Sequence, residues 1–291
     1  QTVTTGGIGS SKAFNNFTIN KTAGAVSLPV TNNIEINGNF TLQAGTMTFD
    51  GNLIYVGGSW SNSGTITWTA GIGEVIFDAV SGTPTIADGS SGFALVKINA
   101  PMVIYQLTEQ TDINGDLTIQ AGTFDLSGQI LEFGDNSNDS IKGSGTMDVD
   151  EGAVLRLFTT TDTGSVVSVN SGGSIRVVGI SGNLANVTRF NGTQSNDRYT
   201  FTVSSGATME ARYAKFEYMN GAGIHLNDGA ILNTTNNFSD TQFDNGRNDG
   251  RYLYIGDIYG TNQFFNINNV GFISAPGGIS YNVQKSNSSD T

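Results

Sequence analysis

The chain has 291 residues, with 39 Gly, 4 Pro and no Cys, and its 25 acidic and 13 basic side chains give a formal net charge of −12. Hydrophobic residues make up 37% and charged residues only 13%, which is typical of a folded chain solvated by neutral polar side chains. The acidic balance and the lack of clustered Lys or Arg exclude nucleic acid and anionic lipid as partners. No stretch approaches 18 consecutive apolar residues, so we expect no membrane insertion.

The N-terminus and the lack of Cys both bear on location. The chain begins at Gln1 without an initiating Met or an apolar leader, as a mature secreted protein or an excised fragment does. Without Cys, the stability of an extracellular protein must come from packing and backbone ladders. We therefore expect an extracellular protein.

The first half of the chain contains a duplicated unit, near residues 14–90 and 93–165. Residues 36–47 (INGNFTLQAGTM) recur as residues 113–124 (INGDLTIQAGTF) at an offset of 77. Upstream, residues 17–20 (FTIN) are echoed by residues 96–99 (VKIN) at an offset of 79. Internal similarity of this kind is typical of repeat architectures.

A shorter pattern recurs within and beyond these units, in which Gly is followed by Thr or Ser and then by apolar, polar and apolar residues. The alternation predicts a half-buried strand, and we expect each entrance Gly to supply the positive φ of a tight corner. Asn residues gather at the same corners, where we expect left-handed conformations and amide ladders between repeats. The five segments are residues 45–49, 64–68, 122–126, 145–149 and 173–177, and the corner Asn residues are Asn37, Asn39, Asn114, Asn220 and Asn237.

The fold class follows from the absence of a helical pattern of apolar residues. No stretch of 12 residues keeps a helical apolar pattern without a Gly or Asn, so we predict an all-β protein. A sandwich or barrel needs antiparallel hairpins, whereas a repeat of about 20 residues with very short strands fits one rung of a parallel β-helix. We predict a single-chain β-solenoid over residues 1–250 with roughly 12 to 14 rungs and a length of about 60 Å.

The second half keeps this pattern with looser rungs over residues 165–250. The apolar residues expected to point inward there are Ala214, Phe216, Ile224, Leu226, Phe238 and Phe243. Residues 251–291 are rich in aromatics and predict either a cap over the open end of the column or the start of a further module. These aromatics are Tyr252, Tyr254, Tyr259, Phe264, Phe265, Phe272 and Tyr281.

Four segments of the first half resemble repeats of large secreted surface proteins of the Bacteroidetes and related phyla. They are residues 14–20 (FNNFTIN), 36–42 (INGNFTL), 58–66 (GSWSNSGTI) and 73–77 (GEVIF). Those proteins are similar to adhesins and to right-handed parallel β-helices, and many are exported by the type IX secretion system through a C-terminal sorting domain. The resemblance covers roughly residues 10–150, implies a right-handed solenoid at the bacterial cell surface, and brings neither a catalytic motif nor a visible sorting domain.

One group of charged residues is a candidate binding or catalytic patch. In enzymatic β-helices, such side chains gather on one exposed face across neighbouring rungs, and Glu210, Arg212, Lys215, Glu217 and His225 are placed to form such a patch. The single His is expected to point outward between two inward residues. Surface ion pairs along outward strand faces explain the same spacing, and we favour that interpretation.

Two acidic segments are candidates for a calcium site. Asp135 and Asp139 belong to a loop with oxygen side chains at alternate positions, but Ser140 and Thr146 stand where an EF-hand requires Gly and Glu. Asp148, Asp150 and Glu151 give three carboxylates within four residues. A Ca²⁺ ion between adjacent loops is therefore one hypothesis, and solvated turns that use Asp for their geometry are the simpler one.

Exposed aromatics are candidates for stacking on sugar rings. Tyr55 and Trp60 fit this role in the sequence, whereas Trp68 follows an apolar position and is expected to pack against the core.

Together these patterns favour a non-catalytic segment of an extracellular surface protein, either an adhesin or a structural spacer of a filament, without a cofactor other than the hypothetical Ca²⁺. Its partners would be other surface proteins or copies of itself. One alternative is a β-helix that binds or degrades polysaccharide, which rests on fold analogy. Another is a fibre subunit that assembles through exposed terminal rungs.

Overall fold

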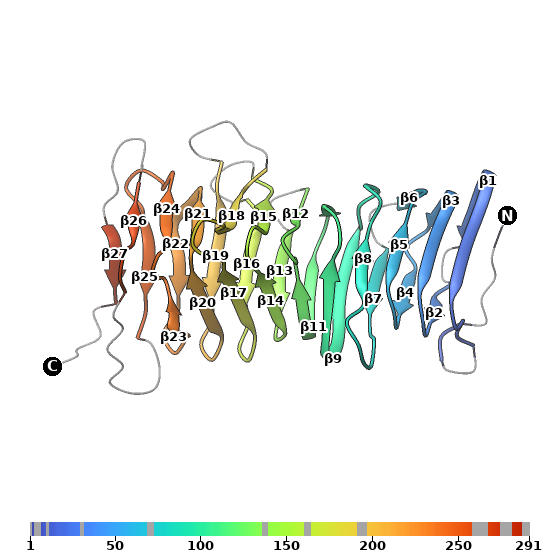
Figure 1. The fold of residues 1–291 in the computed structure, drawn as a ribbon, viewed down its shortest axis with the longest axis horizontal. Coiled ribbons are helices and arrows are strands. Elements are labelled where there is room, and N and C mark those ends of the chain that lie inside the picture. The colour runs from blue at the N-terminus through green and yellow to red at the C-terminus, as the bar shows by residue number, and fades with distance from the viewer. Residues whose placement is uncertain are drawn as a thin grey trace.

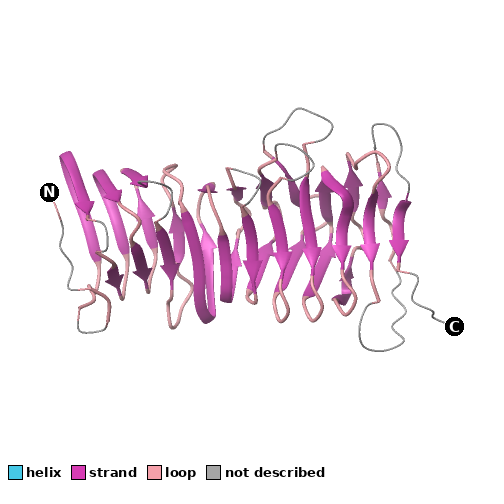
Figure 2. Ribbon diagram, turned by 180° about the vertical axis from the view of Figure 1, so that it is seen from behind, coloured by secondary structure: helices cyan, strands magenta, loops and turns pink. Residues whose placement is uncertain are grey.

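The computed structural model describes residue 2 and residues 7–9, 12–29, 32–68, 73–135, 139–159, 164–190, 197–257, 267–273 and 281–286. These residues form 27 strands stacked along one long axis, with the two ends of the chain at opposite ends of the column (Figure 1). Strands and loops alone build this part of the chain (Figure 2), so it contains no helix that could cross a bilayer. The all-β prediction is confirmed.

The strands stack on three faces of the column, which the chain visits in the order face 1, face 2, face 3. All pairs of neighbouring named strands are parallel, as in a β-helix. Eleven strands pair in succession on face 1: β2 (Ile34–Ile36), β4 (Leu53–Val56), β7 (Glu74–Phe77), the first part of β9 (Leu95–Leu107), the first part of β11 (Leu117–Asp125), β13 (Ser140–Gly143), β16 (Val166–Val169), β19 (Tyr199–Val203), β22 (Met219–Leu226), β25 (Arg251–Ile255) and β27 (Tyr281–Lys285).

Faces 2 and 3 share the long strands that turn a corner. Face 2 holds the first parts of β1 (Phe17–Leu28) and β3 (Phe40–Phe49), then β5 (Trp60–Asn62), β8 (Thr85–Ala87), the ends of β9 and β11, β14 (Thr146–Val149), β17 (Ser174–Val178), β20 (Thr208–Arg212) and β23 (Ile231–Asn237). Face 3 holds the ends of β1 and β3, then β6 (Thr65–Trp68), β10 (Thr111–Ile113), β12 (Ile130–Phe133), β15 (Val154–Leu157), β18 (Ala185–Arg189), β21 (Ala214–Glu217), β24 (Gln242–Asp244) and β26 (Gly271–Phe272).

The number of rungs follows from face 1. A parallel bridge between Phe14 and Ile36 adds one layer before its eleven strands, so the described residues make about twelve rungs, at the low end of the prediction. Rung length varies along the chain. Paired positions Val75 and Val96 lie 21 residues apart, whereas Val167 and Phe201 lie 34 apart.

Inward side chains form one continuous apolar column. Met47, Phe124 and Ile175, from the five recurring segments, are all buried, as the alternation predicted. The six inward residues predicted for the second half are buried as well. Aromatic rings stack along the axis at both ends, with centroids 4.0 Å apart for Phe40 and Trp60. Burial of this unbroken column supplies most of the stability, at about 25 cal/mol per Å² of apolar surface.

The reason for the recurring Gly differs from the prediction at three of the five segments. Gly45 and Gly122 have φ of +98° and +87°, but Gly64, Gly145 and Gly173 do not adopt positive φ. A Cβ at each of these three would lie within 2.6 to 2.8 Å of a carbonyl oxygen of the preceding rung. Close approach of successive rungs, not backbone conformation, therefore requires Gly at these three positions.

The corner Asn residues also serve differently from the prediction. None of the five has a positive φ. The left-handed positions fall instead on other residues, including Tyr213, Tyr218 and Phe238. The amide ladder is present at the first corner, where Asn16 Oδ1 accepts from Asn39 N–H and Asn39 Oδ1 accepts from Ser59 N–H, each at 2.8 Å. At this corner Asn links successive rungs, whereas Asn220 and Asn237 accept from backbone N–H groups two residues ahead and stabilise local turns.

The two copies of the duplicated unit lie on different faces. Phe40 pairs with Phe17 and Trp60 on face 2, whereas its counterpart Leu117 pairs with Val96 and Ile141 on face 1. An offset of 77 residues spans three rungs on face 2, from Phe40 to Leu107, and then the two further faces that lead to Leu117 on face 1. Both environments bury the same positions, which is why one sequence unit suits two faces.

The column continues past residue 250, where the sequence predicted a cap or a further module. β25 and β27 extend face 1, and β26 extends face 3. Tyr252 is buried, and Phe272 stacks on Phe243 with centroids 5.4 Å apart. Tyr252 and Phe272 thus continue the core, whereas Tyr254 points outward and Tyr281 is exposed. Tyr259, Phe264 and Phe265 lie outside the described residues.

Candidate functional site

The charged residues predicted as one patch are distributed over three faces. Glu210 and Arg212 lie on face 2, Lys215 and Glu217 on face 3, and His225 on face 1. Outward side chains on these faces point in three directions, so the five do not form a single patch. The sequence placed them close together because they are neighbours along the chain, but the chain turns two corners between residues 210 and 225.

Four of these five residues are engaged in ion pairs or hydrogen bonds between or within rungs. Arg176 donates to both carboxylate oxygens of Asp148 at 2.7 and 3.0 Å, and its Nε lies 4.0 Å from Glu210 Oε2. Glu210 also accepts from Asn236 at 2.8 Å. Lys215 lies 2.7 Å from Glu217 Oε1. The expectation of ion pairs along outward faces is met on faces 2 and 3.

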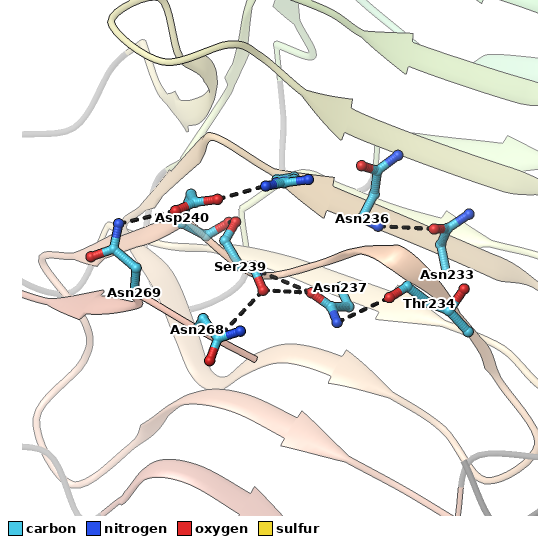
Figure 3. A network of polar contacts seen from close by, with 10 residues as sticks. Asn233, Thr234, Asn236, Asn237, Ser239, Asp240, Asn268 and Asn269 are labelled. Carbon is cyan, nitrogen blue, oxygen red and sulfur yellow. Dashed lines mark hydrogen bonds and ion pairs between the residues drawn. The ribbon is translucent and has the colours of Figure 1, made fainter. Parts of the chain in front are cut away.

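A polar network occupies the corner between β23 and β24 (Figure 3), and Arg212 joins this network through Asp240. Arg212 Nε lies 3.1 Å from Asp240 Oδ2, while Asn269 Nδ2 donates to Asp240 Oδ1 at 3.0 Å. Buried Ser239 donates its hydroxyl to Asn237 Oδ1 at 2.7 Å. The corner is therefore a closed hydrogen-bonded structure that fixes the backbone, and it explains why Asn and Asp accumulate here.

The predicted calcium ligands fall into two groups. Asp139 is buried and accepts from the backbone N–H of Asp135 at 2.9 Å. Asp148 is paired with Arg176, and Asp150 accepts from the N–H of Gly128 at 2.8 Å, whereas Glu151 is an exposed turn residue. Within the described ranges, no three acidic or His side chains gather closely enough to hold a metal ion.

An acidic cluster on face 3 was missed by the sequence interpretation. Asp112 lies near Asp88, Glu132 and Asp135, and burial followed by the repulsion of these three carboxylates raises its pKa to about 6. The only signal in the sequence was a charge imbalance, since residues 22–141 contain twelve acidic residues and Lys97 as the single base. Because successive rungs stack, acidic residues that are far apart in the sequence lie close together in the structure.

The two aromatic candidates have opposite outcomes. Trp60 is 1% exposed and stacks on Phe40 in the core, so the prediction that it offers a surface for sugars is wrong. Residues of β5 alternate between inward and outward positions, and Trp60 takes an inward one. The neighbouring Gly residues obscure this alternation in the sequence. Tyr55 points outward from face 1 and is half-buried between Glu35 and Ile76 of the adjacent rungs.

His225 also points outward, as predicted, and lies in an open hollow of about 370 Å³ on face 1. Three successive rungs contribute to this hollow, through Ser205 after β19, through His225, Asn227 and Asp228 of β22 and its turn, and through Tyr254 of β25. The imidazole stacks on the Tyr254 ring with centroids 4.3 Å apart and an interplanar angle of 19°. An aromatic pair thus forms one wall and a polar turn forms another.

The electrostatics of the hollow are mixed. Arg251 lies 5.1 Å from the Tyr254 ring centroid. Burial lowers the pKa of His225, and Arg251 lowers it further against the opposing effect of Asp228. The imidazole is therefore neutral at pH 7, with one ring nitrogen that donates and one that accepts.

Comparisons of this chain with family models, with curated proteins and with solved structures give no match. The site is therefore interpreted from its own geometry.

A second hollow is an apolar slot between rungs at the corner after β13. It is lined by Ile119, Ile141, Met147 and Val167 and has room for about 20 Å³. A ligand needs a pocket of at least about 300 Å³, so this slot is a packing defect. The hollow at His225 is the candidate functional site.

Proposed function

We propose that the chain is a non-catalytic segment of an extracellular bacterial surface protein, acting as a stiff spacer in an adhesin or filament. The observation that carries this proposal is the continuous stack of parallel rungs over one apolar core, with outward charges paired along faces 2 and 3. Such a column is long and stiff, because backbone hydrogen bonds along the strands join each rung to the next.

The composition and the sequence resemblance support the location. A Cys-free chain with few charges and many Gly, Asn, Ser and Thr residues suits a protein held by backbone ladders in an oxidising environment. The resemblance to repeats of secreted Bacteroidetes surface proteins supports export by a type IX route. Partners of such a rod would be other surface proteins or copies of itself.

The lining of the hollow at His225 supports a non-catalytic role for that hollow. General acid–base hydrolysis needs two carboxyl groups about 5 to 10 Å apart across a substrate cleft. The hollow at His225 contains one carboxylate, Asp228, whose Oδ1 accepts from Asp257 N–H at 2.8 Å. Its His225 makes no hydrogen bond to Ser205 in the described part of the chain, so a nucleophile activated by a base is not assembled there.

Two measurements test this proposal. Small-angle scattering of the purified chain should give a rod about 60 Å long, from about twelve rungs at about 4.8 Å each. Incubation with neutral and acidic polysaccharides, with and without Ca²⁺, should create no new chain ends above those seen with heat-unfolded protein. New ends would refute the non-catalytic role, and a compact or flexible particle would refute the spacer.

A further inference from the structure

We propose that the hollow at His225 and Tyr254 binds a neutral, hydroxyl-rich ligand, namely a sugar unit of a glycan. This goes beyond the spacer function and does not depend on it. A rod that also carries a sugar-binding site would act as an adhesin, and one without it remains a spacer.

The first support is the unused hydrogen-bonding capacity of the hollow. Ser205 Oγ, the side-chain amide of Asn227, the His225 ring nitrogens and the Tyr254 hydroxyl make no hydrogen bond within the described residues. Elsewhere on the column, in contrast, outward polar side chains are joined between rungs, as Arg156 with Glu132 at 2.9 Å on face 3 and Asn220 with Thr200 at 2.8 Å on face 1. The hollow therefore offers donors and acceptors that the fold itself leaves for a ligand.

The second support is the aromatic wall. Outward positions of face 1 on the adjacent rungs are Thr202 and Gln284, which flank His225 and Tyr254 along the axis. The imidazole and the Tyr254 ring are each half-buried and cover one face of each other, so the stack forms an aromatic wall next to the polar groups. A combination of apolar wall and a few convergent polar groups is what small-ligand sites of about 300 to 1,000 Å³ have in common.

The chemistry of the lining selects the ligand class. Ca²⁺ takes six to eight oxygen ligands and Zn²⁺ takes three or four protein ligands from Cys, His and carboxylates, whereas the lining offers one carboxylate, Asp228, and one imidazole, His225. Asp228 also disfavours an anion, although Arg251 lies close to Tyr254. The polar turn disfavours a purely apolar ligand. Hydroxyl groups, which both donate and accept, match the mixture of Ser, Asn, Asp, Tyr and neutral His.

The test is affinity electrophoresis of the full chain through gels that contain dextran, laminarin, mannan or xylan as neutral probes, or alginate or polygalacturonate as acidic probes. We expect retardation by at least one neutral polysaccharide. Tyr254→Phe, which keeps the ring stack, and Asn227→Ala, which lies on a turn, should each weaken retardation by about twofold to tenfold, as loss of one hydrogen bond does. Tyr254→Ala should weaken it further.

The control is Thr118→Ala, which truncates another outward, half-buried side chain on the same face of a distant rung and should leave retardation unchanged. Circular dichroism of each variant verifies that it is folded. The proposal is overturned if no neutral polysaccharide retards the protein, if retardation survives all three hollow variants, or if acidic polysaccharides alone are bound. Failure of this site leaves the scattering and cleavage tests of the spacer untouched.

Discussion

Gly122 and Gly82 form a matched pair that tests how closely successive rungs approach each other. Both lie at the corner between face 1 and face 2, with φ of +87° and +90°. A Cβ on Gly122 would lie 2.2 Å from the carbonyl oxygen of Ala100 and 2.9 Å from that of Val103, on the preceding rung. A Cβ on Gly82 would meet nothing within 4 Å. Alanine therefore imposes similar backbone strain at both positions and a steric clash at only one.

The difference in unfolding free energy follows from these distances. A left-handed conformation costs an alanine about 1 to 2 kcal/mol, which is the whole effect expected for Gly82→Ala. The Cβ of Gly122→Ala lies more than 1 Å inside ordinary contact with a backbone atom, and that atom is held in the ladder between rungs. Overpacking of this kind adds about 1 to 3 kcal/mol, so we expect a total of about 2 to 5 kcal/mol for Gly122→Ala.

Urea unfolding followed by circular dichroism measures both variants. Amide hydrogen exchange then shows where the column opens, because repeat structures unfold in local units. We expect Gly122→Ala to lose protection over residues 95–125 and Gly82→Ala to keep it. Equal destabilisation of the two variants would show that backbone strain alone determines the Gly at these corners and that the inter-rung contact is unimportant.

Three further predictions concern the core and the acidic cluster. Trp60→Ala should cost about 3 to 5 kcal/mol in urea unfolding, and Tyr55→Ala less than about 0.5 kcal/mol; similar losses would contradict the inward position of Trp60. Phe216→Asp places a charge in the core and should cost several kcal/mol, seen as lost amide protection in β21 and β24; unchanged exchange would contradict its burial. Burial raises the pKa of Asp112 from 3.8 to about 6, so the folded state binds more protons than the unfolded state in that window and stability falls as pH rises through it. Asp112→Asn should therefore stabilise the protein at pH 7 by about 1 kcal/mol after allowance for solvent screening, with the gain gone at pH 4; a gain that is independent of pH would contradict the shift.

Parity along the strands was the most informative signal in the sequence. Alternation correctly assigned Phe216, Ile224 and Phe243 to the core and His225 to the surface, because a strand side chain has only two directions. The same rule gave no answer at Trp60, where two preceding Gly residues break the alternation. Burial of that ring follows from its partners Phe40 and Ile86 on adjacent rungs, which are 20 and 26 residues away.

The sequence also did not show on which face of the column each strand lies. Glu210 and His225 are close along the chain, yet they lie on faces 2 and 1 and belong to different sets of neighbours. Conversely, Ser205, His225 and Tyr254 lie 20 and 29 residues apart and line one hollow. Contacts between rungs depend on the length of every corner in between, and corners vary from one rung to the next.

By itself, then, the sequence determined the all-β class, the parallel β-helix, the inward and outward residues of most strands and the duplication, because each of these depends on local periodicity. The tertiary structure decided the registers between rungs, and with them the one-face rotation between the two copies, the ion-pair ladders, the acidic cluster at Asp112 and the hollow at His225. Local periodicity determines whether a side chain points inward or outward, whereas the stacking of rungs determines which residues that side chain contacts. A binding site depends on these contacts between rungs.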